Sequence, residues 1–80
     1  AGPLIQQINA QADEWRALEI ARAQKLIAKG EDIDTVLEAL SRGIAQKMLH
    51  GTMAELHKGD AEQRAQTADT VQRLFLRKER

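Results

Sequence analysis

IDTVLEALSRGIAQKMLHGTMAEL, residues 33–56, is the stretch that decides the fold of this 80-residue chain. Its apolar residues recur three and four positions apart, which is the spacing of one face of an α-helix. They are Ile33, Val36, Leu37, Leu40, Ile44 and Met48. The pattern predicts an amphipathic helix to about Leu49, a break at His50-Gly51, and a short helix after it. The apolar face has to be buried against neighbouring helices or against a second copy of the chain.

Capping signals divide the chain after that break. Thr52-Met-Ala-Glu55 has the Ser/Thr-x-x-Glu form of a capping box, which predicts the start of a short helix with Met53 and Leu56 inward. Lys58-Gly59 ends it, and Asp60-Ala-Glu-Gln63 opens a last helix in the same way. The small and apolar residues along one side of that last helix are Ala61, Ala65, Ala68, Val71, Leu74 and Phe75.

A long first helix is expected from Leu4 to about Lys29, with Pro3 in its first turn and good helix formers throughout. Gly30 is predicted to end it in a left-handed conformation, and Asp32 to cap the next helix. Its apolar stripe comprises Ile5, Ile8, Ala12 and Trp15, continued by Leu18, Leu26 and Ile27. Because apolar residues fill its first turn, we expect it to be the end of a longer helix. Gly43 lies in mid-helix and suggests a close helix–helix approach.

Composition narrows the function classes. Eighty residues make one small domain, near the size at which oligomerisation helps stability. The absence of cysteine excludes disulfides, thiolate metal sites and a thiol nucleophile, and two aromatic residues are too few for a base-stacking platform. Net charge is zero, with a mildly basic second half. No apolar run is long enough to span a bilayer and no signal peptide is evident, so we expect a soluble, cytoplasmic chain.

No residue pattern predicts an active site, a cofactor site or a metal site. His50 and His57 are the only imidazoles, and zinc would require further ligands at suitable spacing. His50 is better explained as a structural residue at a helix end, where it can bond a terminal carbonyl. Neither phosphate-binding glycine motif, GxGxxG or GxxxxGK[ST], occurs. Adjacent carboxylates are interpreted as solvated or capping residues, and the sequence predicts no self-sufficient enzyme.

Three segments resemble the C-terminal dimerisation domain of bacterial glutamyl-tRNA reductase. They are residues 19–30 (EIARAQKLIAKG), residues 37–41 (LEALS) and residues 46–50 (QKMLH). The family's hallmark is a helix that ends in Asn-Lys/Arg-Leu-Leu/Ile-His, followed by Pro-Thr and then Leu. Lys47, Leu49 and His50 match that motif, whereas Thr52-Met53 stands where the family has Pro-Thr. The resemblance covers nearly the whole chain.

The resemblance implies a fragment of a larger enzyme. Residues 1–30 would be the end of its long spinal helix and residues 31–80 the helical dimerisation domain, together one structural unit. The parent enzyme would use NADPH to reduce the glutamate on glutamyl-tRNA to glutamate-1-semialdehyde, for porphyrin and haem biosynthesis. Its implied partners are a second copy, glutamyl-tRNA and the downstream aminotransferase. No cofactor is implied for the fragment itself.

We therefore predict an all-α dimerisation domain, with one long helix followed by two to three shorter helices, packing as a dimeric bundle. The residues expected in the dimer interface or core are Trp15, Leu18, Val36, Leu37, Leu40, Ile44, Met48, Leu56, Val71, Leu74 and Phe75. Two other functions stay open. One is a helical adaptor that binds a partner helix in the groove along the second helix. The other is an accessory tRNA-contacting module that uses the basic second half.

Overall fold

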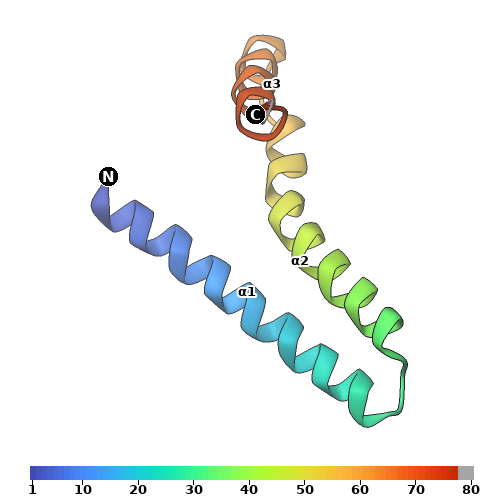
Figure 1. The fold of residues 1–80 in the computed structure, drawn as a ribbon. Helices are drawn as coiled ribbons and strands as arrows, with labels where there is room; N and C mark the ends of the chain where they lie inside the picture. Colours follow the sequence, from blue (N-terminus) through green and yellow to red (C-terminus); the bar gives the residue numbers. More distant parts are fainter. Residues whose placement is uncertain (78–80) are drawn as a thin grey trace. The chain divides into compact units, whose positions relative to one another are not determined.

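The computed structural model describes residues 1–77, which form three α-helices (Figure 1). They are α1 (Gly2–Ala28), α2 (Ile33–Leu56) and α3 (Ala61–Phe75), with 27, 24 and 15 residues. No strand occurs within the described range. The all-α class is thereby confirmed, with a long first helix followed by two shorter ones.

The turn between α1 and α2 forms where Gly30 was predicted to end the first helix. Gly30 has a φ of +91°, in the left-handed region that glycine adopts without steric cost. Its N–H donates to the carbonyl of Ile27 at 3.0 Å, and the N–H of Glu31 donates to the carbonyl of Leu26 at 3.1 Å. These two bonds make a Schellman motif, which satisfies carbonyls that the helix end would otherwise leave open.

Side-chain caps begin α2 and α3, as predicted for both. Asp32 Oδ1 accepts a hydrogen bond from the backbone N–H of Thr35 at 2.8 Å. Asp60 accepts from the backbone N–H of Gln63 at 2.9 Å, and Gln63 Oε1 accepts in return from the N–H of Asp60 at 2.8 Å. This reciprocal pair is a complete capping box. Gly59, with a φ of +84°, supplies the preceding turn.

The predicted break at His50-Gly51 was wrong, because α2 continues through it to Leu56. Gly51 does not have a positive φ, and Thr52 lies inside the helix instead of capping a new one. One glycine costs a helix about 1 kcal/mol relative to alanine, which favourable neighbours can offset. No proline interrupts this region, so each residue keeps the N–H that a helical hydrogen bond requires.

The chain divides into two compact units, of which unit 1 is Ala1–Lys47 and unit 2 begins at Met48. In unit 1, α1 and the first part of α2 run antiparallel on either side of the turn at Gly30 (Figure 1). In unit 2, the end of α2 leads through a short turn into α3. The buried residues of the described range are Glu19, Ala23, Val36 and Gly43. All four belong to unit 1.

Candidate dimer interface

An open apolar groove lies in unit 2, between the last turns of α2 and one side of α3. Its volume is about 520 Å³, and apolar side chains provide nearly all of its surface. Its lining residues are Leu49, Thr52, Met53, Leu56, Ala68, Val71, Gln72, Phe75 and Leu76. Apolar surface that is left uncovered in this way is a candidate association site.

A second, shallower recess follows the exposed side of α2 in unit 1. Leu37, Leu40 and Ile44 form its floor, and Asp34, Glu38 and Ser41 lie at its edge. Apolar side chains are also exposed on α1, where Leu4, Ile5 and Ile8 are each more than half accessible. Unit 1 therefore carries apolar surface that its own helices leave uncovered.

The predicted interface residues fall into three groups by exposure. Val36 is buried within unit 1. The partly buried residues are Trp15, Leu40, Ile44, Leu56 and Val71. The exposed residues are Leu18, Leu37, Met48, Leu74 and Phe75. The groove in unit 2 brings Leu56, Val71 and Phe75 together, whereas Met48 and Leu74 belong to neither lining.

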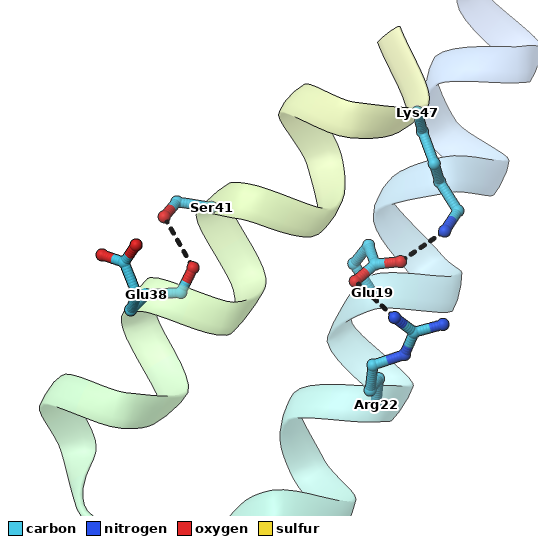
Figure 2. A network of polar contacts seen from close by, with 5 residues as sticks. All are labelled: Glu19, Arg22, Glu38, Ser41 and Lys47. Carbon is cyan, nitrogen blue, oxygen red and sulfur yellow. Dashed lines mark hydrogen bonds and ion pairs between the residues drawn. The ribbon is translucent and has the colours of Figure 1, made fainter. Parts of the chain in front are cut away.

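A buried carboxylate, which the sequence analysis did not single out, lies between α1 and α2 in unit 1 (Figure 2). Glu19 Oε2 accepts a hydrogen bond from Lys47 Nζ at 2.5 Å, and Glu19 Oε1 lies 3.8 Å from a guanidinium nitrogen of Arg22. Figure 2 also shows the Ser41 hydroxyl donating to the carbonyl of Glu38 at 3.1 Å on the exposed side of α2. Only 1% of the Glu19 side chain is exposed.

Two carboxyl groups have pKa values below their usual range. The hydrogen bond from Lys47 lowers the pKa of Glu19, desolvation opposes that change, and the positive charge of Arg22 adds to it. Hydrogen bonds from Thr35 lower the pKa of Asp32, the N-cap of α2. Both groups are therefore held as carboxylates, one as an ion-pair partner and one as a cap.

The three residues of the family-like motif have different surroundings. Lys47 pairs with Glu19 in unit 1, and Leu49 lines the groove in unit 2. His50 is exposed on α2 and does not end a helix, so its predicted role at a helix end was wrong.

A spacing signal could have located Glu19. Trp15, Glu19, Ala23 and Leu26 are four, four and three residues apart, so they share one face of α1. The structure leaves all four at most partly exposed. A charged residue on that face requires a partner of opposite charge, because burying an unpaired charge is unfavourable.

Neither a metal-binding cluster nor a membrane-spanning helix occurs among the described residues. Within residues 1–77, no group of three or more His, Asp or Glu side chains is arranged to hold a metal ion. None of α1, α2 and α3 combines the length and apolar character needed to cross a membrane. What the described surface does provide is apolar area in both units.

The sequence of this chain is similar to part of several known proteins. Glutamyl-tRNA reductase of Acidovorax sp. (strain JS42) is 81% identical over 75 residues, which cover 94% of this chain and 17% of that protein. The enzyme of Polaromonas sp. (strain JS666 / ATCC BAA-500) is 73% identical over 94% of this chain and 18% of its own length. The enzyme of Aromatoleum aromaticum is 41% identical over the same shares. No solved structure matches.

The chain spans less than a fifth of the length of these curated relatives. A family profile described as glutamyl-tRNAGlu reductase, dimerisation domain, matches residues 1–77. That match extends over α1, α2 and α3 and over both apolar surfaces. The chain belongs to the glutamyl-tRNA reductase dimerisation domain family.

Proposed function

We propose that this chain joins two copies of a glutamyl-tRNA reductase into a homodimer through its exposed apolar surfaces. The observation that carries the proposal is the apolar groove of unit 2, together with the absence of any fully buried residue among those described there. A standard interface buries about 800 Å² per partner. Apolar side chains that are more than half exposed, among them Leu18, Leu37 and Leu74, supply candidate surface for such a contact.

The proposed contact uses apolar residues from all three helices. In α2 and α3 it comprises Leu37, Leu40, Ile44, Met48, Leu56, Val71, Leu74 and Phe75, and in α1 it comprises Trp15 and Leu18. Val36 contributes to the core of unit 1. A two-fold axis would let each patch meet its equivalent in the second copy, so every buried side chain counts twice.

The whole enzyme is proposed to reduce glutamyl-tRNA to glutamate-1-semialdehyde with NADPH in the cytoplasm. The domain contributes no reacting group, and its role is to hold two catalytic units at a fixed separation. Residues 1–30 would be the end of the spinal helix that connects them, and residues 31–80 the dimerisation domain proper. Glutamyl-tRNA and the downstream aminotransferase are proposed partners of the whole enzyme.

Sedimentation equilibrium from about micromolar concentration upward tests self-association. A dimer is expected for the unchanged chain, and Leu40→Glu or Ile44→Glu should dissociate it. Burial of one such side chain contributes about 1.5–3 kcal/mol, and a symmetric contact loses it twice. Gln46→Glu is the matched control, because it adds the same charge at an exposed position of α2 outside the recess. A monomer at the highest concentration would contradict the proposal.

Two measurements separate the rival functions. An adaptor that binds a partner helix would remain monomeric alone in sedimentation equilibrium. A tRNA-contacting module would show strongly salt-dependent RNA binding in a binding assay. Pairing of cations with carboxylates three or four residues away, as in Arg42 with Glu38 and Lys58 with Glu55, weakens the case for RNA.

A further inference from the structure

The buried positions of the hairpin in unit 1 hold small side chains around one carboxylate. Ala23 and Gly43 present little side-chain surface, and Val36 is the largest apolar residue that is fully buried. Small residues interlock weakly, because a ridge needs bulk to fill a groove on the facing helix. At these buried positions apolar packing alone gives little to distinguish one alignment of α1 along α2 from the next, and the larger residues on the same face of α1, Trp15 and Leu26, are only partly buried.

Gly43 forms the surface on which the Glu19 carboxylate rests. A Cβ atom placed on Gly43 would lie 2.0 Å from Glu19 Oε1 and 2.5 Å from Glu19 Cδ. Carbon atoms of real side chains do not approach so closely, so any other residue at this position would have to displace the carboxylate. Gly43 does not have a positive φ, so a larger residue is opposed here by the Glu19 side chain of the facing helix and not by the backbone conformation.

One cation from each helix holds the Glu19 carboxylate in place. Lys47 is one turn after Gly43 on α2, and its Nζ reaches Glu19 Oε2 at 2.5 Å. Arg22, one turn after Glu19 on α1, lies 3.8 Å from Oε1. Glu19 Oε1 makes no hydrogen bond. The position of this oxygen therefore rests on the charge of Arg22 and on close contact with Gly43. Sliding α2 by one turn would separate Glu19 from both Gly43 and Lys47.

We propose that Glu19, seated on Gly43 and held by Lys47, is an ionic latch that sets the register of α1 against α2. Buried polar pairs are weak sources of net stability, and selecting one register is their best-attested use. The latch lies within one copy of the chain, so it is independent of the proposed dimer contact.

A double-mutant cycle tests the contact between Glu19 and Gly43. In the unchanged chain, Gly43→Ala should lower the Tm by about 5 °C, because the new methyl group displaces the carboxylate. In a Glu19→Ala background the same change should raise the Tm by about 3–6 °C, which is the usual effect of replacing glycine by alanine in a helix. Gly51→Ala is the matched control: nothing lies within 4 Å of its added Cβ, so it should raise the Tm in both backgrounds.

Spin labels test the register directly. Ala21 and Ala45 are exposed on α1 and α2 within unit 1, and the chain has no cysteine to interfere with labelling. Doubly labelled chains are diluted into unlabelled chain, so that distances within one copy dominate. We expect one narrow distance distribution for the otherwise unchanged chain, and a broadened or shifted one for Glu19→Ala or Lys47→Met.

Two outcomes would overturn the latch. If Gly43→Ala changes the Tm in the same direction in both backgrounds, the carboxylate is not what requires glycine. If Glu19→Ala leaves the distance distribution unchanged, apolar contacts set the register. Neither outcome bears on sedimentation equilibrium, so failure of the latch and failure of dimerisation are distinguishable.

Discussion

Unit 1 and unit 2 each join two helical segments through a short turn, yet their side chains pack in different ways. Unit 1 buries Glu19, Ala23, Val36 and Gly43 between its own helices. Unit 2 buries no described residue completely and leaves an apolar groove of about 520 Å³ open. A glycine with a positive φ and an aspartate cap precede the second helical segment of each unit, so this difference lies in side-chain packing.

Under the proposed dimer, the difference predicts which part of the chain depends more on a second copy. Short helices are only marginally stable in water, and their stability in proteins comes mainly from packing of an apolar face. Unit 1 supplies some of that packing internally. Unit 2 has 15 residues in α3 and no buried position along it, so its stability should depend on what covers the groove.

The largest expected effect comes from placing a charge in that groove. Val71→Glu should remove about 1.5–3 kcal/mol of apolar burial from each copy. Two equivalent losses in a symmetric dimer raise the dissociation constant by about 10²- to 10⁴-fold. Sedimentation equilibrium measures the dissociation constant, and circular dichroism reports whether α3 loses helix as the dimer separates.

Gln66→Glu is the matched control for Val71→Glu, because Gln66 is exposed on α3 and outside the apolar groove. It should leave the dissociation constant within about twofold. If both variants raise the dissociation constant equally, the dimer responds to added charge alone. The groove would then not distinguish unit 2 from unit 1.

A second prediction compares two neighbouring apolar residues of unit 1. Val36 is 3% exposed and Leu37 is 54% exposed. Val36→Ala should lower the free energy of unfolding by about 2 kcal/mol at every protein concentration, because it leaves a cavity within one copy. Leu37→Ala should act mainly through association, so its effect should fade as the chain is diluted. Urea unfolding at two concentrations measures both.

If Val36→Ala and Leu37→Ala show the same concentration dependence, exposure in the single chain does not separate core from interface. In that case unit 1, like unit 2, would depend on its partner for closure.

Local signals were enough to predict most of the fold. Gly30, Asp32 and Asp60 act through bonds to residues within a few positions, so their roles could be predicted from adjacent sequence. The break at Gly51 could not be judged in that way. Whether a helix continues past one glycine depends on the summed preferences of its neighbours, and here they favour continuation.

The side chains that distinguish the two units were harder to predict. Val36 and Leu37 are both apolar members of one helical pattern, and only the facing helix decides which of them is covered. Glu19 is charged, so composition favours a solvated position. Its burial depends on Gly43 and Lys47, which lie 24 and 28 positions away in the sequence. Spacing along α1 could have placed Glu19 on the inner face, but it would not have identified these partners.

A third prediction uses acid to loosen unit 1. The folded-state pKa of Glu19 is lowered from a usual value of 4.5, so its contribution to stability is complete above about pH 4.5. That contribution disappears as the pH falls through the lower, folded-state pKa. The free energy of unfolding should therefore decrease on acidification below pH 4.5, and urea unfolding across this range measures the slope.

Glu19→Gln is the control for that slope, because the amide cannot titrate and has a similar size. The slope should be shallower in this variant but not zero, since the pKa of Asp32 is also lowered. Identical slopes in the two chains would mean that Glu19 does not contribute to acid sensitivity, and that unit 1 is not held by its ion pair.

The smallest expected effect concerns Gly51, close to where the two units meet in the sequence. Open space surrounds its Cβ position, and its φ is not positive, so Gly51→Ala should raise the free energy of unfolding by about 0.5–1 kcal/mol. Gly59 has a φ of +84°, so Gly59→Ala should instead lower it by about 1–2 kcal/mol. A chain broken at residue 51 by a left-handed glycine would lose stability in both variants. Opposite signs in urea unfolding would mean that α2 is continuous, and that the contrast between units 1 and 2 arises from packing along one uninterrupted helix.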